Sequence, residues 1–528
     1  MKKKIVISDT IAEEGIAVLR ENNLFDIVYT PGIKSDELMK ELHDAHGLIV
    51  RSSTKVTAEL IDAAPDLQVI ARAGMGLDNV DIEHATEKGI VVMNTPAGNT
   101  ISTAEHTIAM LLSLVRKIPG ADASMKQGKW EKNRFQGAEL RGKMIAVIGL
   151  GRVGMEVARR CKGLSMRVAG YDPFISKDSK LNVDIEFPDI DDIWRTADFI
   201  TVHTPLNDQT KNLIQKSVIR KMKPSVRLIN CARGGIINER DLYDALKNSE
   251  IAGAALDVFT EEPPASLPPF HELDNVVLTP HLGASTGEAQ VSVAVEAAEI
   301  VAEYLTTGIA RNSVNLPSLD IHELAFLKPY LDLAEKIGRF QGAVTKGRVK
   351  DVSIFYSGDF KSFNLSPLTS SYIRGLLSPY TEYNVNFVNA AFIARERGIR
   401  IQIGEDPVSH DYSHLISIRV TGDEGTSEVW GTVLGKQPWF VKYNEYLIDF
   451  IPSGRMVAMY NNDVPNVIGN VGNFFGSKKI NIANFHLART KRGGKAFMVV
   501  EIDNDLTPEV VEEMKGLPDI IDAQYIVM

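Results

Sequence analysis

The stretch MIAVIGLGRVGMEVARRC (144–161) decides the fold of this 528-residue chain. Its apolar start is typical of a buried β-strand, and the residues after GLGRVG (149–154) have the spacing of a helix. The three glycines of such a pattern permit a tight turn, a close approach of the backbone to a pyrophosphate, and tight packing of the helix on the strand. The helix N-terminus adds free N–H groups for the phosphates. We therefore expect a dinucleotide to contact Gly149, Gly151, Arg152, Val153 and Gly154.

A carboxylate follows at the position that distinguishes one dinucleotide from another. Asp172 ends the next expected strand (166–172), 18 residues after Gly154. A carboxylate there accepts hydrogen bonds from the ribose hydroxyls of the adenosine and repels a 2′-phosphate. The expected cofactor is therefore NAD rather than NADP.

Strand and helix patterns alternate on both sides of this stretch. Six strand-like runs fall between residues 144 and 280, and five more fall within the first hundred residues. Alternation at this spacing predicts parallel sheets with helices on both faces, so the expected fold class is α/β with two doubly wound, Rossmann-like domains. A helical stretch at 287–305 is expected to return to the first domain. The predicted domains are a discontinuous substrate-binding domain of residues 1–97 and 288–315 and a nucleotide-binding domain of residues 98–287.

The character of the sequence changes after residue 315. Residues 316–453 mix helical and strand patterns without a recognisable catalytic group, and we expect them to form an α+β intervening domain. Residues 454–528 have the order β-α-β-β-α-β, which is that of a ferredoxin-like domain.

Composition excludes several classes of protein. Hydrophobic residues make up 44% of the chain and charged ones 24%, which is typical of a globular rather than a disordered protein. The net charge of −10 argues against nucleic acid or an anionic membrane as a partner. The two cysteines, Cys161 and Cys231, can form neither a disulfide framework nor a cysteine-rich metal site. Since no apolar run is long enough to cross a bilayer, we expect a soluble cytoplasmic protein without a metal site.

Three chemically active residues follow later strands of the nucleotide-binding domain: Arg233 in NCARGG, Glu262 in DVFTEEPP and His281 in TPHLGAST. Oxidation of a hydroxy acid needs a base for the hydroxyl proton, and His281 is suited to that role. Glu262 would orient the imidazole and favour its protonated form, and Arg233 would hold a substrate carboxylate bidentately. Taken singly, the histidine is explained as well by a structural role and the Arg–Glu pair by a surface ion pair. Their shared position beyond the strand ends of one domain favours a catalytic site.

These motifs together resemble those of the D-isomer-specific 2-hydroxyacid dehydrogenase family in order and spacing, over about residues 1–315. In that family the arginine, glutamate and histidine have the roles given above. The resemblance also implies cofactor contacts near Thr204, Cys231, Asp257 and Gly283.

ARAGMGLDNVD (71–81) and NTPAGNTISTAEHT (94–107) are similar to substrate-domain motifs of a long branch of that family. Members of this branch continue into an intervening domain and a C-terminal ACT domain, a small-molecule sensing module. The resemblance implies oxidation of 3-phosphoglycerate to 3-phosphohydroxypyruvate, the first step of L-serine biosynthesis. It also implies assembly as homodimers or homotetramers.

A phosphorylated acid needs a local cationic pocket on this net-negative chain. Arginines that end strands of the first domain, together with Arg233, are suited to form it, and neutral side chains nearby would add hydrogen bonds. The candidate substrate ligands are Arg51, Ser52, Arg72 and Asn99. Arg134 is a further candidate that would reach a site from a neighbouring subunit, although a solvated charged loop explains it equally well.

The ACT domains of this branch sense L-serine between copies of the domain. The segments NNDVPN (461–466) and INIAN (480–484) match that position, which implies effector contacts from Asn461, Asp463 and Asn481. ACT domains typically have Pro-Gly where this chain has Pro465-Asn466. Asparagine tolerates a left-handed backbone, so we expect the turn to be kept. The alternative is an assembly module that binds nothing.

Two other functions compete with this interpretation. One is a dehydrogenase of an unphosphorylated acid such as glycerate, glyoxylate or lactate, against which the substrate-domain arginines and the C-terminal extension argue. The other is an NADH-sensing protein like the corepressors of this family, which retain the catalytic residues but act by binding.

Overall fold

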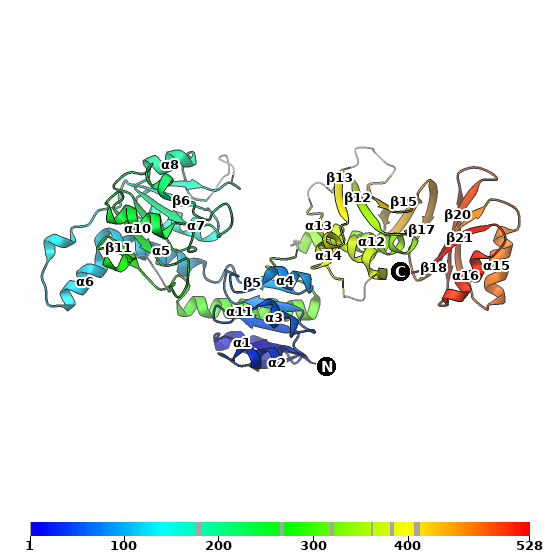
Figure 1. Ribbon diagram of the computed structural model, residues 1–528, viewed down its shortest axis with the longest axis horizontal. Helices are drawn as coiled ribbons and strands as arrows, with labels where there is room; N and C mark the ends of the chain where they lie inside the picture. The colour runs from blue at the N-terminus through cyan, green and yellow to red at the C-terminus, as the bar shows by residue number, and fades with distance from the viewer. Residues whose placement is uncertain are drawn as a thin grey trace.

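The computed structural model describes residues 2–175, 182–264, 269–316, 321–360, 363–380, 385–405 and 412–528. Four β-sheets follow one another along an elongated molecule, with the second sheet at one end and the C-terminal sheet at the other (Figure 1). We expect the intervening domain to begin at residue 316, and residues 317–320 of it lie outside the described ranges.

The N-terminal unit is a five-stranded parallel sheet in the order β2-β1-β3-β4-β5. Side chains of successive strand residues point to opposite faces, so Ile5 and Ile7 pack on one side and Val6 on the other. Helices α1 (Glu13–Arg20) and α11 (Gly287–Thr307) cover the first face. Helices α2 (Ser35–Leu42), α3 (Ala58–Asp62) and α4 (Ile82–Glu87) cover the second. The strands are β1 (Lys3–Ile7), β2 (Phe25–Tyr29), β3 (Gly47–Val50), β4 (Val69–Arg72) and β5 (Val91–Asn94).

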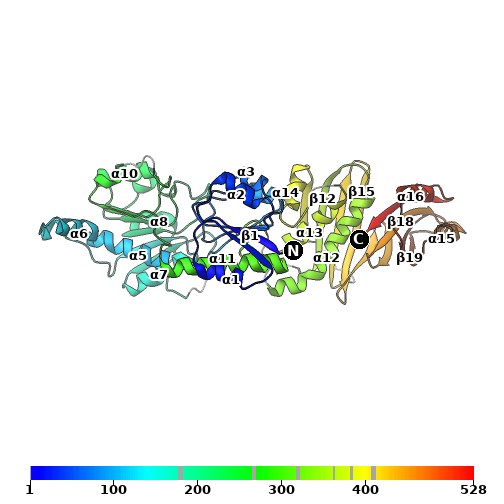
Figure 2. The ribbon, with the colours of Figure 1, turned by 90° about the horizontal axis from the view of Figure 1, so that it is seen from below.

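Helix α11 makes this unit discontinuous. It follows the second unit in sequence, yet Val293, Ala297 and Val301 are buried against the first sheet. Figure 2 shows α11 running beside α1 under the N-terminal strands. The expected return of the helical stretch at 287–305 is therefore confirmed.

The second unit is a six-stranded parallel sheet in the order β11-β10-β9-β8-β6-β7. Helices α5 (Thr100–Arg116) and α7 (Arg152–Gly163) cover one face, and α8 (Ile190–Thr196), α9 (Lys216–Ile219) and α10 (Glu239–Lys247) the other. The strands are buried on both faces, as in other doubly wound sheets. They are β6 (Met144–Ile148), β7 (Arg167–Tyr171), β8 (Phe199–Val202), β9 (Arg227–Asn230), β10 (Gly253–Leu256) and β11 (Val276–Leu278). Helix α6 (Ile118–Lys126) projects from this unit at the far left of Figure 1.

The third unit packs helices on one face of a mixed sheet in the order β13-β12-β14-β15-β16-β17. Its helices are α12 (Ile321–Val344), α13 (Ser366–Leu377) and α14 (Ala390–Glu396). Its strands are β12 (Val349–Gly358), β13 (Arg400–Glu405), β14 (His414–Gly422), β15 (Gly425–Leu434), β16 (Gln437–Tyr443) and β17 (Tyr446–Phe450). This unit meets the N-terminal one where Asn386 Nδ2 donates to the backbone oxygen of Gly89 at 2.7 Å.

The C-terminal unit has the expected order of elements. Its four strands form an antiparallel sheet in the order β19-β20-β18-β21, with two helices on one face. Met456 and Ala458 point to the opposite face and join the core of the third unit, while Val457 and Met459 face the helices. The elements are β18 (Arg455–Asn462), α15 (Val467–Ser477), β19 (Ile482–Arg489), β20 (Lys495–Ile502), α16 (Pro508–Lys515) and β21 (Ile520–Val527). Within the described ranges, no helix has the length and apolar character needed to cross a membrane.

Candidate active site

The carboxyl ends of β9, β10 and β11 bring the three predicted catalytic residues to one edge of the second sheet. Arg233 lies in the loop after β9, Glu262 in the loop after β10, and His281 in the loop after β11. These strands are neighbours in the sheet, so their ends meet although the residues are far apart in sequence. Parallel α/β sheets bind ligands at this edge.

His281 and Glu262 form a direct pair. His281 Nδ1 lies 2.5 Å from Glu262 Oε2, which leaves Nε2 as the ring nitrogen available to a substrate. The second carboxylate oxygen of Glu262 accepts a hydrogen bond from the Phe259 N–H at 2.9 Å. The carboxylate is thus held from two sides, and it fixes the orientation of the imidazole.

The environment keeps Glu262 ionised. Burial by itself raises the pKa of this carboxyl, but the hydrogen bonds from His281 and the Phe259 N–H, with the nearby charge of Arg233, hold the pKa below its ordinary value. The ionised form is the one that accepts a hydrogen bond from the imidazole. The pair therefore has the polarity needed to support a proton acceptor at His281.

Arg233 reaches across to the N-terminal unit. Its Nη1 donates to the backbone oxygen of Ala232 at 2.7 Å, and its Nε lies 3.3 Å from Asp78 Oδ2. A Cβ placed on Gly76 would lie 2.0 Å from Arg233 Nη2, so the guanidinium packs directly against that glycine. A larger residue at 76 would require the Arg233 guanidinium to move.

Arg72 and Arg51 extend the cationic cluster. Arg72 Nη1 donates to the Gly76 backbone oxygen, and Arg72 Nε donates to the Arg51 backbone oxygen at 3.4 Å. Burial, reinforced by the neighbouring Arg233 charge, lowers the pKa of Arg72 to about 10. The three arginines bring like charges close together at neutral pH. An anionic ligand between them would reduce their mutual repulsion.

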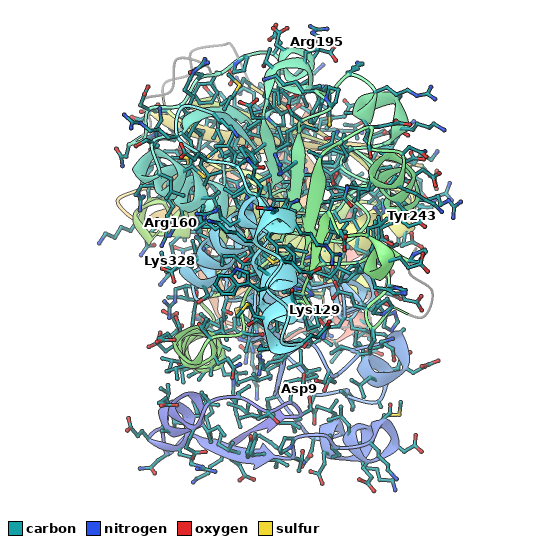
Figure 3. All side chains as sticks on the ribbon, turned by 90° about the vertical axis from the view of Figure 1, so that its left-hand side faces the viewer. Asp9, Lys129, Arg160, Arg195, Tyr243 and Lys328 are labelled. Carbon is teal, nitrogen blue, oxygen red and sulfur yellow. The ribbon has the colours of Figure 1, made fainter. Side chains whose placement is uncertain are left out.

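Asp9 fixes the loop that carries Arg51 and Ser52. It is 4% exposed, and its carboxylate accepts hydrogen bonds from the Arg51 N–H at 2.6 Å and from Thr54 Oγ1 at 2.8 Å. Figure 3 places Asp9 on the side of the N-terminal sheet that faces the rest of the chain. Ser52 is exposed at the same loop.

The glycine turn after β6 has the expected form. Gly149 has a φ of 92°, and Gly154 packs so tightly on the turn that a Cβ would lie 2.0 Å from the Gly149 oxygen. Gly151 precedes α7, and a Cβ there would meet no atom within 4 Å. Arg152 and Val153 form the first turn of α7.

The predicted ribose ligand, Asp172, lies beside this turn. Asp172 Oδ2 accepts a hydrogen bond from the Leu150 N–H at 2.9 Å, which places the carboxylate beside the glycine turn.

Two residues that we expect to contact a ligand have a buried side-chain oxygen without a hydrogen-bond partner in the described chain. Thr204 Oγ1, beyond β8, and Asn99 Oδ1, at the start of α5, have no hydrogen bond within the described chain. Buried polar atoms in native proteins are nearly always paired, so each oxygen is suited to a ligand or a bound water. Thr204 lies against the glycine turn, within the edge expected to take the dinucleotide.

Cys231 and Asp257 lie deeper. Cys231 is 5% exposed, and burial raises the pKa of its thiol to about 12, so it is a packing residue rather than a nucleophile. Asp257 is fully buried, and its carboxylate accepts hydrogen bonds from the N–H groups of Leu282 at 2.8 Å and Gly283 at 2.9 Å. The structure thus gives Asp257 partners inside the chain.

Arg134 is not brought to the arginine cluster within one chain. It belongs to the short helix η1 (Lys132–Phe135), and its Nη2 pairs with Asp274 Oδ2 at 2.9 Å. The suggestion that it serves a neighbouring subunit stays a prediction.

The structure brings together only two of the three predicted effector residues within one chain. Asn461 and Asp463 lie at the turn between β18 and α15, whereas Asn481 precedes β19 at the opposite end of the sheet. Asn461 is 2% exposed, and its Oδ1 has no partner in the described chain. Asp463 accepts hydrogen bonds from Arg489 Nη1 and the Gly493 N–H, both at 2.8 Å, and Asn481 Nδ2 donates to Asp503 at 2.7 Å. Asn466 has a φ of 74°, so asparagine does adopt the left-handed conformation expected of this turn.

The sequence patterns did not reveal two residues of the site. Asp78 contacts Arg233, and His106 Nε2 lies 3.1 Å from Asp257 Oδ1. His106 shares one face of α5 with Thr103 and Met110, a spacing that could have indicated a helix face turned toward the strand ends.

Two family models match the chain. Residues 108–283 match the NAD-binding domain of the D-isomer-specific 2-hydroxyacid dehydrogenases. Residues 326–444 match the intervening domain of D-3-phosphoglycerate dehydrogenase.

Relatives extend over the whole chain. The D-3-phosphoglycerate dehydrogenase of Archaeoglobus fulgidus is 43% identical over 99% of each chain, and that of Bacillus subtilis is 40% identical over 99% of each. Among solved structures, the NAD-dependent formate dehydrogenase of Staphylococcus aureus in complex with NAD has 29% identity and a TM-score of 0.54, covering 60% of this chain and 100% of that one. The TT0316 protein of Thermus thermophilus has 31% identity and a TM-score of 0.53, and the match covers 59% of this chain and 99% of that one.

Proposed function

Because the chain belongs to the D-isomer-specific 2-hydroxyacid dehydrogenase family, in the branch of the D-3-phosphoglycerate dehydrogenases, we propose that it oxidises 3-phosphoglycerate to 3-phosphohydroxypyruvate with NAD. This reaction is the first step of L-serine biosynthesis. The observation that carries the proposal is the meeting of the His281–Glu262 pair with a cluster of three arginines.

The residues at the glycine turn fit a dinucleotide. The backbone at Gly151 is open on the side where a pyrophosphate would lie, and the N-terminus of α7 offers its N–H groups there. The Asp172 carboxylate beside this turn supports a contact with the adenosine ribose, and Thr204 Oγ1, which has no partner in the described chain, supports a contact with the cofactor. NAD, when bound, accepts a hydride from C2 of the substrate.

The chain supplies the proton acceptor for this oxidation. His281 Nε2 takes the proton of the C2 hydroxyl as the hydride leaves, while Nδ1 donates its hydrogen bond to Glu262. The ionised Glu262 stabilises the imidazolium that results. Arg233 holds the substrate carboxylate and polarises the oxygen at C2.

The phosphate of the substrate explains the other arginines. Arg51 and Arg72 lie on the N-terminal unit, facing Arg233 on the second unit. A substrate with a carboxylate at one end and a phosphate at the other would bridge the two units. Ser52, which is exposed on the Arg51 loop, and Asn99, whose Oδ1 has no partner in the described chain, would add neutral hydrogen bonds.

We assign the substrate-binding domain to residues 1–97 and 288–315, the NAD-binding domain to 98–287, the intervening domain to 316–453 and an ACT domain to 454–528. The unpartnered Oδ1 of the buried Asn461 supports an effector at the last of these, and we propose L-serine as that effector. Assembly as a homodimer or homotetramer would bring two such domains together.

An assay with purified protein tests the function. With NAD and 3-phosphoglycerate, NADH should form, and L-serine should slow its formation. His281→Ala should lower kcat by about 100-fold or more, the scale of general-base catalysis. His271→Ala, at an exposed histidine of the short helix η2 (Phe270–Glu272), is the matched control and should leave kcat unchanged.

Each competing function predicts a different result. Turnover of glycerate or lactate without turnover of 3-phosphoglycerate would assign the protein to unphosphorylated acids. Tight NADH binding without turnover of any hydroxy acid would assign it to the sensing proteins. A kcat of His281→Ala equal to that of the wild type would remove His281 from the role of base.

A further inference from the structure

Asp257 is a buried carboxylate with a single potential cation beside it. Its side chain is completely inaccessible to solvent, and no lysine or arginine lies within ion-pair distance of it in the described part of the chain. His106, on helix α5, places Nε2 3.1 Å from Asp257 Oδ1. A buried charge without a partner is strongly unfavourable, so the imidazole is one of the groups that stabilise an ionised Asp257 here.

Asp257 in turn fixes the segment that carries His281. Its carboxylate accepts hydrogen bonds from Thr279 Oγ1 at 2.6 Å and from the N–H groups of Leu282 at 2.8 Å and Gly283 at 2.9 Å. Its backbone oxygen accepts a fourth bond from the His281 N–H at 2.8 Å. The residues on both sides of His281 are therefore tied to one buried side chain.

His281 needs this support because of its backbone. Its φ of 54° lies in the left-handed region, which costs a residue other than glycine about 1–2 kcal/mol. Such a conformation persists only where the surroundings enforce it. The bonds from Asp257 to the segment 279–283 supply that constraint, and they aim the imidazole at Glu262.

We propose that His106 is a positioning residue for the dehydrogenase reaction, acting through Asp257 to hold His281 in its reactive orientation. This inference rests on the proposed function, since it concerns the same base. The hydrogen-bond and ion-pair partners of His106 in the described chain are Asp257 and Thr279, so its polar influence on His281 passes through these two residues.

The electrostatics of Asp257 agree with this role. Burial raises the pKa of the carboxyl, but the hydrogen bonds from His106, Thr279 and the Leu282 N–H lower the pKa below its ordinary value. An ionised Asp257 accepts all of these bonds at once, whereas a protonated one would lose an acceptor. Removing His106 therefore weakens the anchor of the segment without touching the substrate.

Two substitutions separate the role of His106 from general packing. His106→Gln keeps an N–H donor of similar reach and should retain kcat within about threefold. His106→Leu removes the donor and should lower kcat at least tenfold, since small misplacements of a catalytic group cost up to about 100-fold. The KM for 3-phosphoglycerate should stay within about threefold of the wild type, because His106 is not among the residues expected to hold the substrate.

A kinetic isotope effect distinguishes misalignment of His281 from a general loss of stability. With substrate deuterated at C2, the isotope effect on kcat should rise in His106→Leu, because transfer at the misaligned base becomes rate-limiting. His84→Gln is the matched control. It removes a histidine that lies outside the site and is also paired with an aspartate, since His84 Nε2 lies 3.0 Å from Asp62 Oδ1. The side chain of His84 is 20% exposed, close to the 18% of His106. This control should behave as the wild type.

A folded His106→Leu with wild-type kcat and isotope effect would overturn the inference. If that variant does not fold, His106→Asn replaces it, because the shorter amide does not reach Asp257; equal kcat values for His106→Asn and His106→Gln would then overturn it. Failure of the proposed function is a separate result. In that case the wild type itself would not oxidise 3-phosphoglycerate.

Discussion

Alanine at two glycines of the same turn should separate cofactor binding from folding. A Cβ at Gly151 meets no protein atom within 4 Å, whereas a Cβ at Gly154 lies 2.0 Å from the Gly149 backbone oxygen. The first substitution therefore disturbs only a ligand that approaches the turn. The second disturbs the packing of α7 on β6 whether or not the ligand is present.

The distances set the size of each effect. The Gly154 contact is an ångström shorter than the 3.0 Å below which Cβ contacts are essentially never seen, and its partner is backbone that cannot rotate away. Overpacking of this kind costs about 1–3 kcal/mol, so Gly154→Ala should lower the free energy of unfolding by that amount and weaken NAD binding. Gly151→Ala should leave the free energy of unfolding unchanged and raise the Kd for NAD about tenfold or more, which corresponds to about 1.4 kcal/mol.

Thermal unfolding and NAD titration followed by fluorescence or calorimetry measure the two quantities. Gly163→Ala is the matched control, because it lies on the same helix, is exposed and also has no atom within 4 Å. It should bind NAD normally and be as stable as the wild type or up to about 1 kcal/mol more stable. Normal NAD binding by Gly151→Ala would refute the placement of the pyrophosphate over this turn.

Three further predictions concern single residues. Asp172→Asn keeps an oxygen for the Leu150 N–H but loses the charge, so the ratio of kcat/KM for NAD to that for NADP should fall at least tenfold; an unchanged ratio contradicts the role of Asp172. Asn466→Gly, at a φ of 74°, should raise the free energy of unfolding by about 0.5–1 kcal/mol, seen as a higher Tm, because glycine adopts this conformation without strain; a lower Tm contradicts it. Burial lowers the pKa of His203 to about 4 from its ordinary 6.5, so its contribution to stability is complete above pH 6.5 and is lost as the pH falls toward 4, by up to about 3 kcal/mol. Urea unfolding at pH 7 and pH 5 should show a smaller loss in His203→Gln than in the wild type, and equal losses would contradict the assignment.

The elements that can be predicted from the sequence are those whose own residue pattern depends on whether each face is buried. The strands of the two parallel sheets are buried on both faces and appear as short apolar runs. The C-terminal elements have the order β-α-β-β-α-β that the sequence predicts. The third unit was predicted less completely. Helix α13 is buried along almost its whole length and includes Thr369, Ser370 and Ser371, so no amphipathic period marks it.

The candidate site divides in the same way. Arg233, Glu262 and His281 were found because each follows a recognisable strand, and the parallel order of β9, β10 and β11 makes neighbours of their loops. Asp257 was found through the family resemblance, which implied a cofactor contact. Its role in holding the segment 279–283 depends on hydrogen bonds that no spacing reveals.

The sequence by itself determined the dinucleotide turn, since Gly149, Gly151 and Gly154 act through constraints on the backbone within a few residues of one another. Tertiary structure alone decided that Arg233 packs against Gly76 of the N-terminal unit, and that His106 of α5 meets Asp257 at the end of β10. These contacts depend on how the two units face each other and on where α5 crosses the sheet. Such geometry is set by the packing of whole elements, and for that reason it leaves no local pattern in the chain.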